Sequence, residues 1–591
     1  MTMDESDESA KGADVTQLAS NLARIEALSA RLVAALGDKK QIRPSLQGPG
    51  PELWLKAMGA WMNTFASDPA RLMQDQLKYW SDLLRHAAEQ GRDEAGGEAL
   101  ELPLLQVARA QYLAAQDATE RALAELEGLD EKDRERVRFF AHQMLELMAP
   151  RNFLATNPEA LARAVETEGQ SLIDGLENMV RDLETHQGEL IPTLADPNAF
   201  KVGHDLATSP GAVVFRNRMM EIIQYEALSE QVHATPLILF PPWINKFYIL
   251  DLKQKNSLVR WICEQGFTLF VVSWVNPDEN YRDVGIDTYI EEGFLRAIEE
   301  VKQLCRVKKV NVAGYCIGGT VLSLTLALLE KRGDRSVKSA TFLTTLTDFS
   351  EPGEVGVFLD DDFVDGIEAE CDEVGYLDHL FMARTFNYLR ARDLVYAPAV
   401  RSYLLGEAPP AFDLLFWNGD GTNLPGRMTV EYLRLLCQQN LFAGKGLALL
   451  GEELHLSDIA VPLCSVACES DHIAPWKSVY QGMRAMASAD KTFILSQSGH
   501  IAGIVNPPSK QKYGHYTNES WPETADDWRA GADFHQGSWW PRWGKWLAKR
   551  SGRKVAARPL GCGDGARILG PAPGQYVTLA PGAVSGRQPG K

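Results

Sequence analysis

The chain has 591 residues and a formal net charge of −19 at pH 7, from 60 Lys and Arg against 79 Asp and Glu. Apolar residues make up 45% and charged residues 24%, which is ordinary for globular proteins and excludes global disorder or a fibrous repeat. The acidic balance argues against a general nucleic-acid binder, because such a protein needs a basic face for the phosphates. No apolar run approaches the ~20 residues that span a bilayer, so we expect no transmembrane segment.

Residues 1–50 are expected to form an N-terminal tail that is disordered at first and helical later. The start is polar and acidic, without the features of a secretion signal, and eight scattered cysteines without paired CxxC units favour a reduced, cytoplasmic setting. Apolar residues spaced three or four apart from Val15 to Leu36 predict a helix that ends at Gly37. Its apolar stripe can pack on its own domain or on a partner.

Residues 51–205 are predicted to form an α-helical N-terminal domain. The stretch is rich in Ala, Leu, Glu, Gln and Arg and has almost no strand-like runs. We expect its aromatic side chains to belong to a core, and an apolar docking face is the alternative. These residues are Trp54, Trp61, Phe65, Tyr79 and Trp80.

Short apolar runs and amphipathic helical stretches alternate after about residue 206, which is typical of βαβ units and a parallel sheet covered on both faces. The runs are 236–240, 268–274, 309–316 and 339–346, then 461–471 and 491–500. An irregular, acidic stretch at 348–446 interrupts the alternation and is a candidate cap, or lid, over the carboxyl ends of the strands. We therefore expect an α/β core in two parts, 206–347 and 447–557, with the cap between them and a C-terminal tail at 558–591.

A glycine-rich turn joins the run 309–316 to the helix predicted after it, with the sequence Gly-Tyr-Cys-Ile-Gly-Gly at 314–319. A nucleophile between glycines at a strand-to-helix turn is typical of the nucleophile elbow of α/β-hydrolases. The glycines permit a strained turn and close packing of helix on strand, which leaves the central side chain exposed at the edge of the sheet. That side chain is the thiol of Cys316, which we predict to be the nucleophile.

In α/β-hydrolases the acid and then the base follow the nucleophile along the chain, each on a loop after a later strand. Asp471 follows the run 461–468, and His500 follows 491–498. Asp471 can orient an imidazole, and His500 can accept the proton of the thiol. His472 lies beside the predicted acid, and we expect its side chain to point elsewhere.

The oxyanion hole of this fold uses two backbone N–H groups. The first is predicted to be that of Ile317, directly after the nucleophile. The second comes from the loop Pro241–Asn245, where proline cannot donate, so Trp243, Ile244 and Asn245 remain and we favour Ile244. The residues predicted to line the substrate pocket are Trp243, Asn245, Tyr315, His472 and Trp476. No metal ligands are predicted.

A thiol nucleophile indicates acyl transfer more than hydrolysis. A thiol that attacks an acyl thioester exchanges one thioester for another at little change in free energy, so the acyl group stays activated for a hydroxyl acceptor. Aromatic residues on the loops and in the insertion can ring the site and exclude water, although ordinary core packing explains them equally well. They are Trp243, Trp274, Phe416, Trp417 and Trp476.

Long blocks of the chain resemble the polyhydroxyalkanoate synthase family, in the order that the family has them, from residue 200 to about 550. The blocks are LFPPWINKFYILDL, SWVNPD, GYCIGGT, FDLLFWNGDGTNLPG, ESDHIAPW, SGHIAGIVNPP and HQGSWWPRWGKWL. The elbow and the length of nearly 600 residues are similar to the class I enzymes, which use short-chain monomers.

The resemblance implies polymerisation of (R)-3-hydroxyacyl-CoA, typically 3-hydroxybutyryl-CoA, into a polyester with release of CoA. No cofactor is implied, since the CoA thioester is substrate and CoA is product. Cys316 would carry the acyl group, His500 would be the general base, and Asp471 would orient His500 or help to activate the hydroxyl of the monomer. The resemblance further implies a homodimer in the cytoplasm and at the surface of polyester granules, with granule-associated proteins as possible partners. It assigns the helical N-terminal region to granule association and dimer stability, and it implies a poorly packed C-terminal tail.

Two other functions remain open from the residues alone. A cysteine-type α/β-hydrolase or thioesterase acting on a small ester or acyl-CoA would have the same elbow and triad. A catalytically silent protein of the granule surface could keep the scaffold without using it. Replacement of Cys316 separates the silent protein from both enzymes.

Overall fold

The computed structural model describes residues 5–37, 43, 51–67, 69–93, 103–124, 126, 128–563 and 565–579. The chain divides into two compact units. Unit 1 comprises Met1–Asp196 and Arg384–Ala411, and unit 2 comprises Pro197–Ala383 and Phe412–Lys591. The expected cap, residues 348–446, therefore contributes to both units, and the domain boundaries drawn from the sequence stay a prediction.

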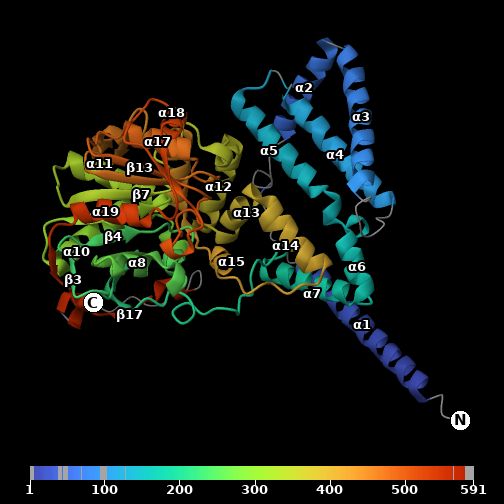
Figure 1. The fold of residues 1–591 in the computed structure, drawn as a ribbon, viewed down its shortest axis with the longest axis horizontal. Helices are drawn as coiled ribbons and strands as arrows, with labels where there is room; N and C mark the ends of the chain where they lie inside the picture. Colours follow the sequence, from blue (N-terminus) through green and yellow to red (C-terminus); the bar gives the residue numbers. More distant parts are fainter. Residues whose placement is uncertain are drawn as a thin grey trace. The chain divides into compact units, whose positions relative to one another are not determined.

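Unit 1 is helical (Figure 1), as the composition of residues 51–205 predicts. Its helices are α1 (Glu5–Gly37), α2 (Pro51–Ser67), α3 (Pro69–Asp93), α4 (Pro103–Ala124), α5 (Glu131–Leu147), α6 (Pro158–Glu166), α7 (Gln170–Thr185) and α14 (Ala397–Ala399). Part of the insertion packs on α7, where Tyr403 donates a hydrogen bond to Asp182 (2.7 Å) and Asn178 donates to the carbonyl of Ser402 (3.0 Å). None of the helices in the described part of the chain is both long and apolar enough to cross a membrane.

Helix α1 ends at Gly37, the residue expected from the sequence, and packs along α7. Leu28 is buried with Ile173 and Val180 of α7, and Arg31 pairs with Glu184 at 2.6 Å. Part of the apolar stripe of α1 thus packs on its own unit.

The aromatic residues of α2 and α3 do not all form a core. Trp61 is 42% exposed and Trp80 is 56% exposed, so the prediction that they are core residues is wrong. The buried cluster of this region is aliphatic instead, because Leu53, Leu123 and Val137 fill the space between α2, α4 and α5. The side chains of Trp54 and Phe65 lie outside the described residues.

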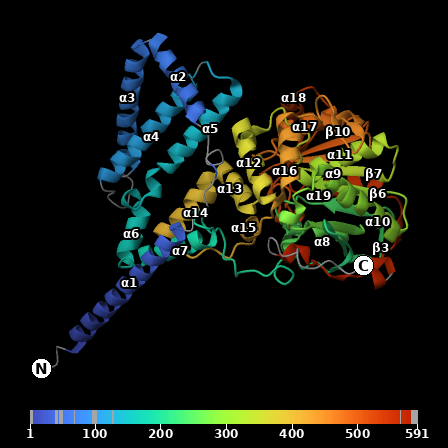
Figure 2. The same ribbon diagram turned by 180° about the vertical axis from the view of Figure 1, so that it is seen from behind.

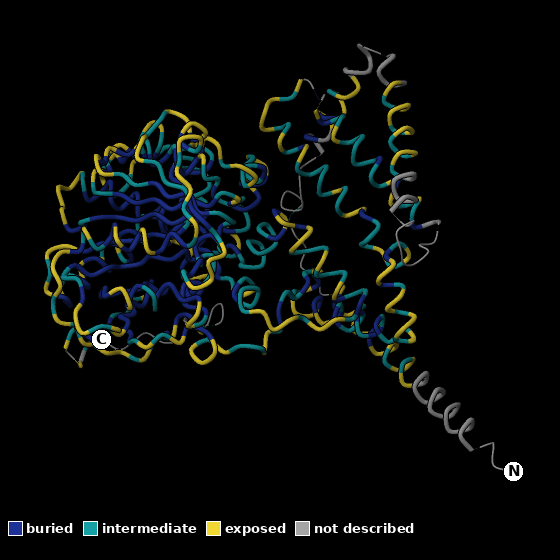
Figure 3. Tube along the Cα trace, viewed as in Figure 1, coloured by how far each residue is buried: buried dark blue, intermediate teal, exposed yellow. Residues whose placement is uncertain are grey.

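Unit 2 is built on one mixed sheet of eleven strands, in the order β15-β14-β13-β12-β7-β6-β4-β5-β2-β1-β17. The six strands from β13 to β5 in this order are parallel, and each coincides with or overlaps one of the predicted apolar runs. These strands are β4 (Leu237–Phe240), β5 (Leu269–Trp274), β6 (Val310–Tyr315), β7 (Val337–Leu343), β12 (Leu463–Cys468) and β13 (Lys491–Ser496). They form the buried centre of the unit (Figure 3).

Antiparallel strands outside the predicted apolar runs extend the sheet at both edges. They are β1 (Gly211–Arg216), β2 (Met220–Tyr225), β14 (His515–Thr517), β15 (Asp533–His535) and β17 (Gly570–Pro571). Short hairpins or pairs outside the sheet involve β3 (Gln231–His233), β8 (Tyr376–Leu377), β9 (Leu424–Pro425), β10 (Leu447–Leu449), β11 (Glu452–Leu454) and β16 (Lys554–Ala556).

Helices cover both faces of this sheet (Figures 1 and 2). Helices α8 (Leu258–Glu264) and α19 (Trp540–Arg550) bury Ile262, Trp543 and their neighbours against one face. Helices α10 (Arg296–Cys305), α11 (Ile317–Lys331) and α17 (Trp476–Ala485) contact strands from the other side. The remaining helices of unit 2 are α9 (Ile286–Thr288), α12 (Asp361–Val374), α13 (His379–Leu389, whose last six residues belong to unit 1), α15 (Asp413–Asn418), α16 (Gly426–Glu431) and α18 (Ala525–Ala530).

The C-terminal segment, residues 558–563 and 565–579, packs on the edge of the sheet. Strand β17 pairs with β1 through Val213 and Ala212, and the buried carboxylate of Glu221 accepts the N–H groups of Gln575 (2.8 Å) and Tyr576 (3.0 Å). The expectation of a poorly packed tail is therefore wrong for these residues. Val577 is also buried in the core of unit 2, and Ala572 packs against that core.

Candidate active site

The nucleophile elbow lies between β6 and α11. Strand β6 ends at Tyr315, α11 begins at Ile317, and Cys316 between them has φ 53° and ψ −127°, which is strained for a residue with a side chain. A Cβ atom on Gly314 would lie 2.5 Å from the Cα of Gly319, so this close approach of strand and helix requires glycine. The turn therefore holds the Cys316 thiol at the carboxyl edge of the sheet.

Asp471 and His500 lie on the loops after β12 and β13 and contact each other. Nδ1 of His500 is 2.7 Å from Oδ2 of Asp471, while Oδ1 of Asp471 accepts the N–H groups of Ile473 and Ala474, both at 2.9 Å. The charge of Cys316 also acts on His500 and raises its pKa. The structure thus brings together the three residues predicted from separate loops, with His500 hydrogen-bonded to Asp471 and next to Cys316.

The surroundings of His500 favour its protonated form. Burial by itself lowers the pKa of His500, but the charges of Asp471 and Cys316 and the hydrogen bonds to them raise it to about 10. The hydroxyl of Tyr315 donates to the carbonyl oxygen of His500 at 3.1 Å, and the two rings stack with centroids 5.6 Å apart. Tyr315, predicted as a pocket residue, thus also holds the backbone of the base in place.

The predicted oxyanion donors lie on two segments that pack closely. Ile317 is the first residue of α11, where helix geometry leaves backbone N–H groups without partners in the helix. A Cβ atom on Gly318 would lie 2.5 Å from the carbonyl oxygen of Phe240 and 2.6 Å from that of Pro241. The helix start therefore lies against the loop that carries Ile244, whose own carbonyl accepts the N–H of Thr422 at 2.9 Å.

Residues of the insertion make hydrogen bonds and an ion pair to the segment that follows β4 and to the loop that follows β5. The indole N–H of Trp417 donates to the carbonyl of Lys246 (2.7 Å), and Asp420 pairs with the ammonium of Lys246 (2.6 Å) and accepts from the hydroxyl of Tyr248 (2.9 Å). The backbone N–H of Asn423 donates to Asn276 at 3.0 Å. The motif at 412–426 thus holds two of the loops that follow the sheet strands.

The predicted pocket residues lie in different environments. Trp243 is 2% exposed and packs among Trp274, Tyr289 and Phe294, so it belongs to an aromatic cluster beneath the loop. Asn245 donates to the carbonyl of Asn418 at 3.3 Å. His472 and Trp476 are partly buried and follow Asp471 in the same loop and at the start of α17. Their contact with substrate stays a prediction.

Two further residues near the nucleophile were not identified from the sequence. Tyr432, in η12 (Tyr432–Gln438) of the insertion, is partly buried, and the pKa of its hydroxyl is raised by desolvation, by Cys437 and by the nearby Cys316. Thr344 directly follows β7 and lies beside Cys316, since Tyr315 pairs with Leu343, the last residue of β7. It has φ 41°, and its buried hydroxyl has no hydrogen-bond partner among the described residues. No spacing in the sequence relates either residue to the elbow.

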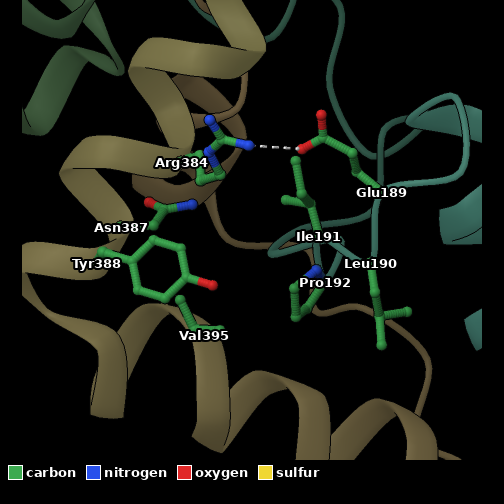
Figure 4. A pocket seen from close by; sticks show the side chains of 8 residues that line it. All are labelled: Glu189, Leu190, Ile191, Pro192, Arg384, Asn387, Tyr388 and Val395. Carbon is green, nitrogen blue, oxygen red and sulfur yellow. Dashed lines mark hydrogen bonds and ion pairs between the residues drawn. The ribbon is translucent and has the colours of Figure 1, made fainter. Parts of the chain in front are cut away.

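Unit 1 has a separate pocket of about 270 Å³ (Figure 4). Its wall includes the ion pair of Arg384 with Glu189, at 3.4 Å, and the side chains of Tyr388 and Val395. The eight described residues that line it include neither a thiol nor an imidazole, so it does not supply the chemistry of the elbow.

Comparison with known proteins adds two family matches. The model for the N-terminus of poly-beta-hydroxybutyrate polymerase (PhaC) matches residues 98–262, and the model for the alpha/beta hydrolase fold matches residues 236–507. The second match confirms the α/β-hydrolase fold predicted from the elbow.

Curated relatives match most of the chain. It is 42% identical over 532 residues to a poly(3-hydroxyalkanoate) polymerase subunit PhaC of Cupriavidus necator, covering 86% of this chain and 88% of the relative. A poly(3-hydroxyalkanoate) polymerase of Methylorubrum extorquens is 43% identical over 479 residues, covering 81% and 79%. A subunit PhaC of Rhizobium meliloti is 36% identical over 528 residues, covering 89% and 84%.

Proposed function

Because the chain belongs to the poly(3-hydroxyalkanoate) polymerase family of acyltransferases, we propose that it polymerises (R)-3-hydroxyacyl-CoA, in the first place 3-hydroxybutyryl-CoA, and releases CoA. The observation that carries this proposal is a thiol at the elbow, close to a buried His500 that is hydrogen-bonded to Asp471. The acyl group is held as a thioester on Cys316, so its activation is kept between steps.

The first step loads the acyl group. The raised pKa of His500 makes its imidazole a stronger base, which accepts the proton of the Cys316 thiol and so forms the reactive thiolate. The thiolate attacks the thioester carbonyl, and the oxyanion accepts hydrogen bonds from the N–H groups of Ile317 and Ile244. When the tetrahedral intermediate collapses, the bond to sulfur of CoA breaks, and the imidazolium donates its proton to the departing CoA thiolate.

The second step extends the polyester. Neutral His500 accepts the proton of a 3-hydroxyl group, and that oxygen attacks the acyl group on Cys316. An ester bond forms, the bond from carbon to the Cys316 sulfur breaks, and the thiolate returns beside the imidazolium. Asp471 stabilises the imidazolium in both steps because its carboxylate accepts from Nδ1. Buried aromatic residues such as Trp243 and Trp417 support exclusion of water from the thioester.

We further propose that the enzyme acts in the cytoplasm and at the surface of polyester granules, as a homodimer. Three exposed apolar residues at helical spacing on α3 support contact with an apolar phase: Leu77 (66%), Trp80 (56%) and Leu84 (70%). Dimerisation rests on the family relationship alone.

Release of CoA from (R)-3-hydroxybutyryl-CoA by the purified full chain, followed with a thiol reagent, tests the proposal when the product is extracted into chloroform. Chloroform-soluble polyester supports the polymerase, and free 3-hydroxybutyrate would instead show a thioesterase. No CoA release from this substrate or from longer 3-hydroxyacyl-CoA would refute the proposal. Cys316→Ala should abolish release, whereas Cys371→Ser, at a buried thiol of α12, should leave it unchanged.

A further inference from the structure

Two cysteines outside the active site face each other at the edge of unit 2. The Sγ atoms of Cys305 and Cys562 are 3.6 Å apart, within hydrogen-bond distance, and both thiols are free. Cys305 is the last residue of α10 and is buried, whereas Cys562 lies in the C-terminal segment and is half-buried. One thiol of the pair is thus enclosed, and solvent reaches the other.

The two thiols differ in reactivity. The hydrogen bond from Cys305 lowers the pKa of Cys562 against the opposing effect of burial, and the positive charge of Arg558 lowers it further. The same hydrogen bond, together with burial, raises the pKa of Cys305. A half-exposed thiol of lowered pKa beside a buried thiol is the arrangement in which the first sulfur is oxidised and the second resolves the product.

The segment around Cys562 is anchored on both sides of it. Gln224 donates to the carbonyl of Pro559 at 3.0 Å, and Arg567 pairs with Glu300 of α10 at 3.2 Å. Between these anchors Cys562 stands between Gly561 (φ 62°) and Gly563 (φ 92°). The anchors keep the sulfur atoms together, and the glycines let the backbone adjust as the S–S distance falls to the ~2.05 Å of a disulfide.

We propose that Cys305 and Cys562 are a thiol-oxidation site that forms a reversible disulfide with a hydroperoxide and fastens the C-terminal segment to α10. The Cys562 thiol loses its proton, and the thiolate attacks an oxygen of hydrogen peroxide. The O–O bond breaks, Cys562 becomes a sulfenic acid, and the departing hydroxide takes up the proton from the thiol and leaves as water. The sulfur of Cys305 then attacks the Cys562 sulfur, the S–O bond breaks, and the thiol proton leaves with the hydroxide as a second water. The two thiols together lose two electrons, and the peroxide gains these two electrons.

The site is separate from the reaction centre, since the nucleophile Cys316 lies at the carboxyl end of β6 and Cys305 precedes that strand at the end of α10. Its effect is on the C-terminal segment, where Leu569 and Ala572 donate to the carbonyl groups of Val213 and Gly211. A cross-link restricts the opened form of the segment, so exchange of these amides should slow by on the order of tenfold.

The test treats the full chain with hydrogen peroxide, alkylates remaining thiols in denaturant and maps disulfide-linked peptides by mass spectrometry. We expect a Cys305–Cys562 peptide that dithiothreitol dissolves, and slower amide exchange in residues 565–579 of the oxidised protein. Cys371→Ser should keep the cross-link, and Cys562→Ser should lose both the cross-link and the slower exchange. Complete alkylation of Cys305 and Cys562 in the treated wild-type chain, or Cys562 oxidised to sulfinic acid while Cys305 stays alkylated, would overturn the proposal. The wild-type measurement stands even if the variant does not fold.

Discussion

Replacement of Asp471 by Asn tests how the buried carboxylate works through His500. Asn keeps the size of the side chain and removes the charge that, with the Cys316 thiolate, raises the pKa of His500 from 6.5 to about 10. That rise corresponds to on the order of 5 kcal/mol of preference for the imidazolium. If most of this preference acts in the transition state, the rate of CoA release should fall about 10²- to 10⁴-fold.

The assay is steady-state CoA release from (R)-3-hydroxybutyryl-CoA, with folding checked by thermal unfolding. Glu469→Gln is the matched control, because this carboxylate lies on the same loop and pairs with Arg529 at 3.2 Å away from the triad. We expect the control to remain within about twofold of wild type, since exposed ion pairs contribute little. Activity of folded Asp471→Asn within the same twofold range would refute the role of the carboxylate.

Four further predictions follow from the same geometry. Cys316→Ser should lose nearly all CoA release, because a hydroxyl is a far weaker nucleophile near neutral pH, and a serine variant with most of the activity would exclude a covalent thiol mechanism. Gly318→Ala should place a methyl group 2.5 Å from the carbonyl oxygen of Phe240. The free energy of unfolding in urea should fall by about 1–3 kcal/mol, and the rate of CoA release should also fall. An unchanged unfolding midpoint would contradict this packing. Tyr315→Phe removes the donor to the His500 carbonyl and should lower the free energy of unfolding by about 1 kcal/mol in the same experiment. An unchanged free energy of unfolding would show that this hydrogen bond does not contribute to stability. Folding raises the pKa of His500 from 6.5 to about 10. The contribution of His500 to the free energy of unfolding is therefore complete below pH 6.5 and is lost as pH rises through about 10. Asp471→Asn should flatten this decline, and an equal slope of unfolding free energy against pH in both proteins would show that the carboxylate is not its cause.

The central strands could be predicted because they are short, mainly apolar runs, most of them buried on both faces, as in Leu237–Phe240 and Leu463–Cys468. The edge strands β14, β15 and β17 could not, because they have only two or three residues each and their place depends on hydrogen bonds to a partner strand. Strand β17 consists of Gly570 and Pro571 alone, and only its pairing with β1 makes it a strand. The exposure of Trp61 and Trp80 was missed because helical spacing shows which residues share a face, not whether a neighbour covers it.

The triad residues could be identified because the elbow marks Cys316 by its local sequence and the fold fixes the order in which Asp471 and His500 follow. The contribution of the insertion to the site could not be predicted. Tyr432 and Asp420 reach the site by tertiary contacts, and neither has a motif that relates it to the strands. Thr344 is recognised only from the structure, by its positive φ beside the nucleophile, because no sequence pattern marks it.

The central claim is that the growing acyl group is carried on Cys316. The most direct test mixes the full chain with (R)-3-hydroxybutyryl-CoA, quenches the reaction in acid before turnover is complete, and identifies acylated peptides by mass spectrometry. The account predicts 3-hydroxybutyryl units, single or oligomeric, on the peptide that contains Cys316, and none in Cys316→Ala. Release of CoA and formation of polyester with the acyl group found on another residue, or with no acyl group on the protein at any time, would contradict it.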